Sequence, residues 1–306
     1  MKDKGVEGFF RIYERTLISN TGVICKNIKD QHNIISRRPA PHLVSVSKNV
    51  LAICGVGGIQ TYHYVIDYLS SFLHLTEKDF SQYKVLVEKK NNYTTQWLKI
   101  IRPDILECNI IETKYTIAEN LISITNAAGV AGQMMKACEA QDGTSGAQTE
   151  DRINFLRSRV MKTIKSENKR DLLVLSKRNY SRLISNWDEL RDLCELFCEK
   201  FNLKLYIHDD KSMPSVEEQL LSFASAKIVL GSHGAGFVNI LACEKGTLFI
   251  ECKYQDRNHG GSIQEEPRCF EQLASAIGLN YKKSLVVDQK VKIDELSNLI
   301  ADNYKT

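Results

Sequence analysis

The sequence predicts an α/β protein made of two domains, each built around a parallel sheet. Short apolar runs typical of buried strands alternate with segments of helical periodicity along most of the 306 residues. That length suits two domains of ordinary size, each able to bury its own core. Periodicity fades in residues 126–150, which are rich in Gly, Ala, Gln, Ser and Thr and indicate a mobile loop near the boundary. We therefore place the domains at 1–150 and 151–290, and the helix at 291–306 could pack back on the first domain.

The composition is that of a globular protein and gives no sign of a nucleic-acid or membrane partner. The 41 Lys and Arg residues barely outnumber the 37 Asp and Glu, and a net charge of +4 is too small to indicate nucleic acid, although it suits an anionic small ligand. No run of about 18 apolar residues is present, and Met1–Lys4 leads into no signal-like apolar core. The nine cysteines form no C-x-x-C pair, which favours a reducing, cytoplasmic setting.

The first half alternates strands and helices, although its first 45 or so residues show no clear pattern. A helix is expected at 61–75 and another at 91–102, where Pro103 stops it. Apolar side chains at the helical period make the inner face of the first of these: Val65, Ile66, Leu69, Phe72 and Leu73. Strands are expected at 43–54, 84–88, 105–111 and 121–125.

The second half shows the same alternation more clearly. A basic helix at 152–165 is expected to bridge the halves, and Ser185 or Asn186 can cap the helix that comes after them. Ser215 to Glu218 has the form of a capping box at a helix start. Strands are expected at 171–175, 204–207, 226–231 and 247–251, and further helices at 186–201, 215–224, 267–278 and 293–304.

The glycine loop (Ser232–Gly236) follows the strand at 226–231 and opens a short helix that runs to about Cys243. Strand, glycine turn, helix and strand form the phosphate-binding unit of doubly wound α/β domains. Two glycines and Ala235 let the backbone approach a ligand closely, and a helix N-terminus offers free N–H groups to an anion. His233 adds a donor. The alternative is a plain glycine turn that joins core elements.

The basic loop (Ser176–Asn186) follows the first strand of the second domain and carries Lys177, Arg178 and Arg182. Ligands bind at the carboxyl ends of the strands in open α/β sheets, and both loops should open at the same sheet edge. Arginines there could clamp a diphosphate through forked hydrogen bonds. The alternative is a solvated basic loop.

The segment from Leu172 to Cys252 resembles glycosyltransferase family 61, which includes plant xylosyltransferases and O-linked N-acetylglucosaminyltransferases. The shared pattern joins two arginines four residues apart, an apolar pair and an Asn, a Glu-Gln helix, the glycine loop with a following Asn, and a strand that ends in Glu. The matching residues are Arg178, Arg182, Leu183, Ile184, Asn186, Glu218, Gln219, His233, Gly234, Ala235, Gly236, Asn239 and Glu251. Upstream, residues 62–67 resemble the family's N-terminal helix, with Asp67 four positions after His63.

This resemblance implies two facing Rossmann-like domains with parallel sheets (the GT-B type) and an active site in the cleft between them. It implies inverting transfer from a nucleotide sugar, with no metal and no other cofactor. The donor would be a UDP-sugar of the xylose or N-acetylglucosamine class, and the acceptor a glycan or protein hydroxyl. The chain could also be one domain of a larger polypeptide.

An inverting transfer needs a group that accepts the proton of the acceptor hydroxyl. At 100° per residue, His63, Asp67, Ser70 and His74 fall within about 60° of one another on the helix at 61–75. Asp67 or His63 could be the base, alone or as a pair. Ser70 and His74 fit a solvated helix face better.

Other groups must stabilise the leaving diphosphate. The two arginines and the amides of Gly234–Gly236 could take its charge, while Glu251 could hold ribose or sugar hydroxyls of the donor. Glu218 could equally cap its own helix. The complete set of donor-side candidates is Lys177, Arg178, Arg182, Ser232, His233, Gly234, Ala235, Gly236, Asn239 and Glu251.

The sequence contains two other motifs and leaves two other functions open. His208-Asp209-Asp210 is similar to an acidic metal motif, but that motif is normally Asp-x-Asp, and we assign no metal ligand. Residues 55–58 resemble a dinucleotide turn that lacks the third glycine and a suitably placed acid. The alternative functions are a non-catalytic module that binds a nucleotide or glycan, and a sugar-nucleotide epimerase on the same fold.

Overall fold

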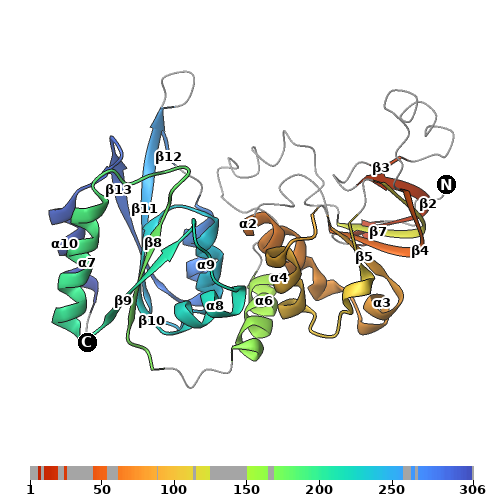
Figure 1. The fold of residues 1–306 in the computed structure, drawn as a ribbon, viewed down its shortest axis with the longest axis horizontal. Coiled ribbons are helices and arrows are strands. Elements are labelled where there is room, and N and C mark those ends of the chain that lie inside the picture. Colours follow the sequence, from red (N-terminus) through yellow and green to blue (C-terminus); the bar gives the residue numbers. More distant parts are fainter. Residues whose placement is uncertain are drawn as a thin grey trace. The chain divides into compact units, whose positions relative to one another are not determined.

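The computed structural model describes residues 6–7, 10–19, 24–25, 44–53, 61–87, 89–112, 115–124, 150–164, 169–257, 263–265 and 268–304 (Figure 1). The chain divides into two compact units, unit 1 (Met1–Phe155) and unit 2 (Leu156–Thr306), so the division falls inside helix α6 (Glu150–Thr163). The glycine turn at 55–58 and the break in periodicity at 126–149 lie outside the described residues.

Unit 1 contains a mixed sheet in the order β1-β2-β7-β4-β5-β6, with β3 paired to β2. β7, β4, β5 and β6 run parallel as expected, but β2 is antiparallel to β7, and β1 and β3 are antiparallel to β2. The prediction of a wholly parallel sheet was therefore wrong here, because the unassigned N-terminal residues supply the antiparallel strands. The strands are β1 (Val6–Glu7), β2 (Phe10–Ser19), β3 (Ile24–Cys25), β4 (Val44–Ile53), β5 (Lys84–Val87), β6 (Ile110–Ile111) and β7 (Tyr115–Ile124).

The expected helix at 61–75 exists but changes its winding twice. It comprises α2 (Thr61–His63), the π-helix η1 (Tyr64–Tyr68) and the 3₁₀-helix η2 (Leu69–His74). The N–H of Leu69 bonds the carbonyl of Tyr64, five residues back, as a π turn requires. Most of the predicted inner face is buried, but the change of winding leaves Leu73 36% exposed. It also buries Ser70, whose hydroxyl donates to the carbonyl of Ile66, so Ser70 does not lie on a solvated face.

Of the remaining helices of unit 1, α4 begins close to its predicted position, whereas α3 and η3 were not expected. Asn91 caps α4 (Asn92–Ile101) in a reciprocal capping box with Thr94. The other helices are α3 (Glu77–Gln82) and η3 (Glu107–Asn109), which replaces the start of the strand expected at 105–111. A small core cluster lies on the sheet and contains Val50, Ala52, Leu86, Ala118 and Leu121.

Unit 2 contains the doubly wound sheet that the sequence predicts. Its strand order is β14-β13-β11-β10-β8-β9, and all neighbours from β13 to β9 are parallel. β9 lies on one side of β8, and β10 and later strands lie on the other, so the winding reverses between β8 and β10. The strands are β8 (Leu172–Lys177), β9 (Lys204–Asp209), β10 (Ala226–Ser232), β11 (Leu248–Arg257), β12 (Ile263–Glu265), β13 (Asn280–Val287) and β14 (Lys290–Val291).

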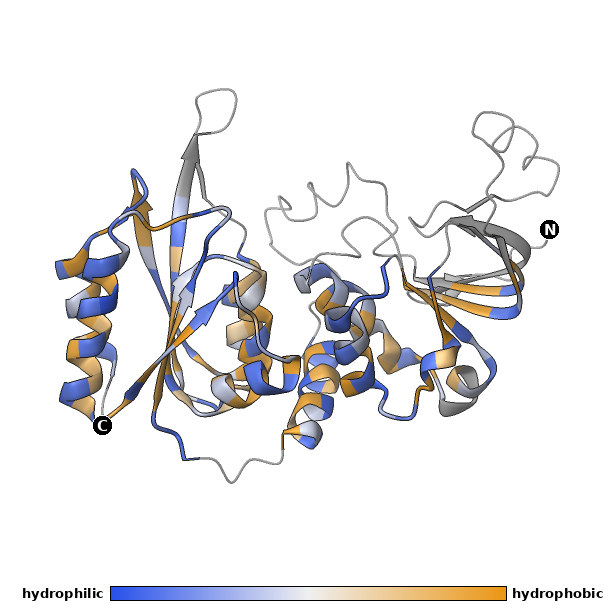
Figure 2. Cartoon of the chain, viewed as in Figure 1, coloured by the Kyte–Doolittle hydropathy of each residue, from blue (hydrophilic) through white to orange (hydrophobic). Residues whose placement is uncertain are grey.

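Helices cover both faces of this sheet (Figure 1). One face carries α7 (Trp187–Phe201) and α10 (Ile293–Asn303), and the other carries α8 (Val216–Ala224), the 3₁₀-helix η4 (Ala235–Ala242) and α9 (Cys269–Ile277). Figure 2 shows hydrophobic residues along the central strands and both residue types on α7 and α10. None of the described helices combines the length and the apolar character needed to cross a membrane.

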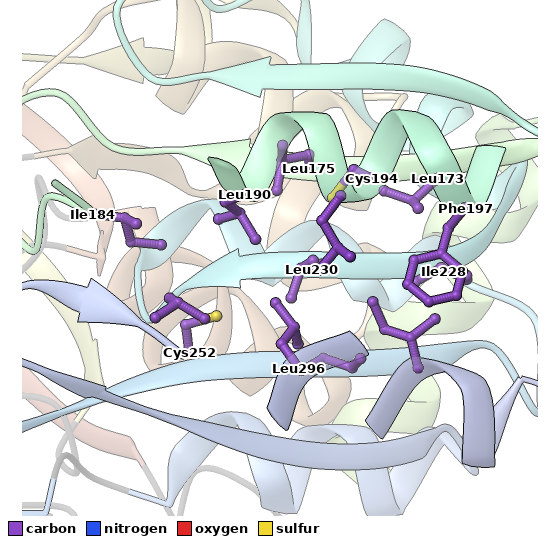
Figure 3. Close-up of a cluster of buried hydrophobic side chains, with 14 of the residues drawn as sticks. Leu173, Leu175, Ile184, Leu190, Cys194, Phe197, Ile228, Leu230, Cys252 and Leu296 are labelled. Carbon is purple, nitrogen blue, oxygen red and sulfur yellow. The ribbon is translucent and has the colours of Figure 1, made fainter. Parts of the chain in front are cut away.

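The C-terminal helix α10 packs within unit 2, against α7 and β13, although we had allowed that it could pack on the first domain. Its apolar side chains Leu296 and Ile300 complete the core between α7 and the sheet. Figure 3 shows Leu296 facing this cluster beside Cys252, Ile228 and Leu230. Burial of these two side chains in the core of unit 2 accounts for the position of the helix.

β10 and β8 approach closely near the end of β10, where a glycine is required. Gly231 has φ 154°, and a Cβ there would lie 2.5 Å from the carbonyl oxygen of Ser176. Any side chain would push the two strands apart at the point where the glycine loop and the basic loop begin. The glycine therefore sets how closely the two loops start.

His208, near the end of β9, is buried without polar contacts. Among the described residues neither of its ring nitrogens has a hydrogen-bond partner, and its ring lies edge-on to Phe223. Burial lowers the pKa of His208 to about 4, although the charges of Asp210 and Asp209 oppose this shift. The imidazole is therefore neutral at physiological pH.

We expect this histidine to make unit 2 less stable in mild acid. The pKa of His208 is about 4 in the folded protein and 6.5 in the unfolded chain. Between pH 7 and pH 5, therefore, His208 becomes protonated in the unfolded chain but stays neutral in the folded protein. The free energy of unfolding should fall by about 2 kcal/mol across that interval from this residue alone. His208→Leu should lose this part of the pH dependence. Urea unfolding at both pH values, followed by Trp187 fluorescence in a Trp97→Phe background, measures the difference, and equal pH dependence in the two proteins would contradict the assignment.

Candidate active site

The basic loop and the glycine loop meet at the carboxyl edge of the sheet in unit 2, as the sequence predicts. The basic loop follows β8 and the glycine loop follows β10, the two strands between which the winding reverses. Such a reversal leaves a crevice between neighbouring loops, because the chain leaves the two strands in opposite directions. This edge is therefore the candidate ligand site of unit 2.

The two loops are in contact through Arg178 of the basic loop and Gly234 of the glycine loop. A Cβ built on Gly234 would collide with Nη1 of Arg178, so the guanidinium lies directly against the glycine backbone. Gly234 has φ 176°, an extended conformation open to any residue, so the neighbouring arginine and not the backbone angle requires glycine. Arg178 also pairs with Asp210, with Nε 3.3 Å from Oδ2, and donates to the hydroxyl of Ser181 at 2.9 Å.

Asp209 and Asp210 hold the basic loop in place. The side-chain amide of Asn179 donates to Asp209 at 2.6 Å and to Asp210 at 2.7 Å, and its backbone N–H donates to Asp210 at 2.9 Å. Their resemblance to a metal motif thus has a structural explanation, since both carboxylates bind the neighbouring loop. Within the described residues, no group of three or more His, Cys, Asp or Glu side chains is arranged to hold a metal ion.

The glycine loop leads into the N-terminus of η4, as predicted. The N–H of Phe237 is the first to bond within the helix, to the carbonyl of Gly234 at 3.0 Å. The amides of Ala235 and Gly236 precede it and have no acceptor within the helix, so they can donate to an anion. His208 leaves little room for a side chain at Gly236, since a Cβ there would lie 3.0 Å from Nε2 of His208.

Glu251 is buried and positions His233. It is fully buried on β11, where Oε1 lies 2.5 Å from Nδ1 of His233 and Oε2 accepts the hydroxyl of Tyr281 at 2.7 Å. Burial, together with the Glu251 charge, raises the pKa of Tyr281, so the phenol stays protonated and donates. Both its oxygens are engaged within the protein, and its expected role in holding donor hydroxyls stays a prediction. The carboxylate keeps the proton of His233 on Nδ1.

Asn239 and Glu218, two further motif residues, have structural contacts. Asn239 is fully buried in η4, and its amide donates to the side chain of Gln219 at 3.0 Å, which in turn donates to the carbonyl of Pro214. These hydrogen bonds tie η4 to α8, and the expected role of Asn239 on the donor side stays a prediction. Glu218 completes a capping box with Ser215, and these hydrogen bonds lower the pKa of Glu218.

The other predicted donor-side residues lie on the two loops. Ser232 is buried at the end of β10, and Lys177 ends β8 with its ammonium 5.2 Å from the centre of the Trp187 ring. Arg182 is partly buried and has φ 54°, an uncommon left-handed conformation for a side chain of its size. Asn186, predicted with Ser185 as a possible cap, occupies the N-cap position of α7, but its side chain makes no capping hydrogen bond. Its side-chain amide instead pairs with both backbone groups of Val291.

The predicted pair in unit 1 is formed. Nδ1 of His63 lies 2.6 Å from Oδ2 of Asp67, and the side chains are 23% and 12% exposed. Arg152 of α6 is fully buried nearby and donates to the hydroxyl of Ser71 at 2.6 Å. Burial lowers the pKa of Arg152 to about 10, while the negative charge of Asp67 opposes that shift. The charges of Asp67 and Arg152 are therefore close enough to interact.

Several site residues were missed by sequence analysis. Asp210 and Asn179 were visible as a polar cluster, but nothing in their spacing indicated a clip between loops. Tyr281 and Arg152 carried no local signal, because each reaches its partner from an element distant in sequence. Only the tertiary fold brings such residues together.

Neither curated sequences nor solved structures indicate the function of this chain. A search of curated protein sequences finds no match. Among solved structures, the chain is similar to a mutant flavo di-iron protein from Thermotoga maritima, with 11% identity, a TM-score of 0.33 and coverage of 78% of this chain. The chain spans half the length of that protein, and a similarity this low carries no argument about function.

The family described as glycosyltransferase 61 matches residues 61–250. The match covers more than half of the 306 residues and includes the His63–Asp67 pair, the basic loop and the glycine loop. The chain belongs to glycosyltransferase family 61.

Proposed function

We propose that the protein transfers a sugar from a UDP-sugar to a hydroxyl group, with inversion at the anomeric carbon and without a metal ion. The single observation that carries this proposal is the contact between Arg178 and the backbone of Gly234, beside the free amides of η4. A cation and helix amides directed at one place suit a diphosphate. Family membership supplies the reaction class.

The donor site of unit 2 would stabilise the leaving group. As the bond between the anomeric carbon and the β-phosphate oxygen breaks, the electron pair stays on that oxygen, and negative charge grows there. Arg178, the amides of Ala235 and Gly236, and His233 would stabilise this charge. Glu251 accepts the Nδ1 proton of His233 and fixes the ring, so His233 would donate to the phosphate through Nε2 as an imidazolium whose charge Glu251 balances.

The pair in unit 1 would supply the base. Asp67 accepts the Nδ1 proton of His63, which leaves the lone pair on Nε2 to accept a proton. The acceptor hydroxyl would give its proton to Nε2 as its oxygen forms the new bond to the anomeric carbon. We therefore assign His63 as the base and Asp67 as the residue that orients it, where the sequence left both roles open.

The sugar is proposed to be xylose or N-acetylglucosamine, and the acceptor a glycan or protein hydroxyl, on family resemblance. We also propose the two-domain GT-B arrangement on that basis, with unit 2 as the donor side. A module that only binds a nucleotide would have no use for an oriented His–Asp pair in unit 1.

Binding of UDP should survive removal of divalent metal ions. Arg178 and the η4 amides would take the place of a cation, and Asp209 and Asp210 are already bound to Asn179. Calorimetric titration of UDP with and without excess EDTA should give dissociation constants that agree within about threefold. A loss beyond about tenfold, equal to roughly 1.4 kcal/mol, would overturn the metal-free proposal.

Gly234→Ala should weaken UDP binding by about tenfold or more without destabilising the fold. The new methyl group must displace the flexible end of Arg178, and a charge-assisted hydrogen bond to phosphate is lost. Gly246→Ala is the matched control, because a Cβ there meets nothing within 4 Å and its φ of 78° strains only a remote turn. The control should lower the melting temperature slightly and leave the affinity unchanged. If both variants bind UDP like the wild type, Arg178 does not hold the diphosphate.

His63→Ala and Asp67→Asn should slow transfer while donor affinity stays within about twofold. Loss of a general base typically costs about a hundredfold or more. Asp67→Asn should also cost rate, because an amide cannot hold the same ring tautomer. Single-turnover transfer and UDP titration measure the two quantities separately. A His74→Ala control, on the same helix, should behave like the wild type, and unchanged transfer in His63→Ala would move the base elsewhere.

A further inference from the structure

An open pocket of about 360 Å³ adjoins the proposed diphosphate site on unit 2. Its lining residues are Lys177, Arg178, Asn179, Leu183, Ile184, Ser185, Trp187 and Gln289. Arg178 belongs to both places, because it lines the pocket while its guanidinium lies against Gly234. A ligand whose phosphates contact Arg178 can therefore extend another group into this pocket.

The lining combines an aromatic ring, apolar side chains and a few polar groups. Trp187 is the first residue of α7, and the partly exposed Leu183 lies near the buried Ile184. Lys177 holds its ammonium 5.2 Å from the indole centre. A flat heteroaromatic ring with carbonyl oxygens suits such a lining, since it can stack on the indole and accept a hydrogen bond from the ammonium.

The far wall of the pocket is fixed by the turn between β13 and β14. Asp288 and Gln289 both have positive φ, 51° and 62°, as in the tight turns that join antiparallel strands. The carbonyl of Gln289 accepts the backbone N–H of Ser185 at 2.7 Å and its hydroxyl at 3.0 Å. These bonds and the pairing of Asn186 with Val291 hold the turn against the basic loop, so the pocket exists before a ligand arrives.

We propose that this pocket binds the nucleobase of the sugar-nucleotide donor, with the base stacked on Trp187 and a base carbonyl bonded to Lys177. The proposal rests on the proposed function, because it takes the donor to be a nucleoside diphosphate sugar. Neither Trp187 nor the turn at Gln289 belongs to the sequence pattern shared with the family. The pocket volume falls within the range of small-molecule sites, about 300–1,000 Å³.

The test compares UDP with inorganic pyrophosphate, which carries the phosphates without a base. Both are titrated by calorimetry into the wild type, Trp187→Ala and Trp187→Phe. Trp187→Ala should weaken UDP binding by about tenfold or more, the usual loss for a stacked base. Its affinity for pyrophosphate should stay within about twofold of the wild type. Trp187→Phe keeps an aromatic face and should recover most of the UDP affinity.

A matched control lies on the same helix. Leu196 is 59% exposed on α7 and does not line the pocket, so Leu196→Ala should change neither affinity. The chain has two Trp residues, and Trp97 is buried in unit 1, so Trp97→Phe leaves Trp187 as the only indole. UDP should quench the fluorescence of that variant, and pyrophosphate should not.

The outcomes separate this proposal from the function it rests on. If Trp187→Ala binds UDP like the wild type, or loses UDP and pyrophosphate equally, the base does not bind here, although the diphosphate site stands. Absence of quenching by UDP in Trp97→Phe has the same meaning. If the wild type binds neither UDP nor pyrophosphate, the donor site itself is wrong, and the base pocket falls with it.

Discussion

The candidate donor site depends on one close contact, that of the Arg178 guanidinium with the backbone of Gly234. This contact requires that β8 and β10 be neighbours, that both loops leave the same sheet edge, and that no side chain intervene. Gly231 meets the first need, because it lets the strands approach at Ser176. The clip from Asn179 to Asp209 and Asp210 holds the basic loop from its other side. Loss of Gly231, Gly234 or the Asn179 hydrogen bonds would therefore be expected to free the Arg178 guanidinium from its present position.

A second constraint concerns buried charge. Glu251 is fully buried, and a carboxylate in such a place is tolerated only when its oxygens are hydrogen-bonded. Tyr281 and His233 meet that need from β13 and from the glycine loop. Glu251 is fixed by the sheet and in turn fixes the imidazole of His233, because a rotation of that ring would break its hydrogen bond to Glu251. The orientation of His233 thus depends on residues that lie outside the glycine loop.

Local periodicity and the rules of parallel sheets determine the features that could be predicted from the sequence. The strands and helices of unit 2, the meeting of the two loops and the i, i+4 pairing of His63 with Asp67 are of this kind. Contacts between distant segments could not be predicted. The role of Glu251 depends on Tyr281, and the wall of the Trp187 pocket depends on a turn 104 residues after Ser185. The antiparallel strand β2 could not be predicted either, because its polar and apolar residues do not alternate clearly.

The π turn in the His63 helix has a consequence for how this segment can vary. A π turn closes on the fifth residue instead of the fourth, so it accommodates one residue more than an α-helix of the same rise. The wider turn absorbs the extra residue, so the side chains after Tyr68, including those that fill the core at Leu69 and Phe72, still point inward. A single deletion between Tyr64 and Tyr68 would let this turn close as an ordinary α-helix, and the side chains on either side would keep their directions. The segment should therefore tolerate the loss of one residue here better than a regular helix, in which one deletion turns the remainder by about 100°.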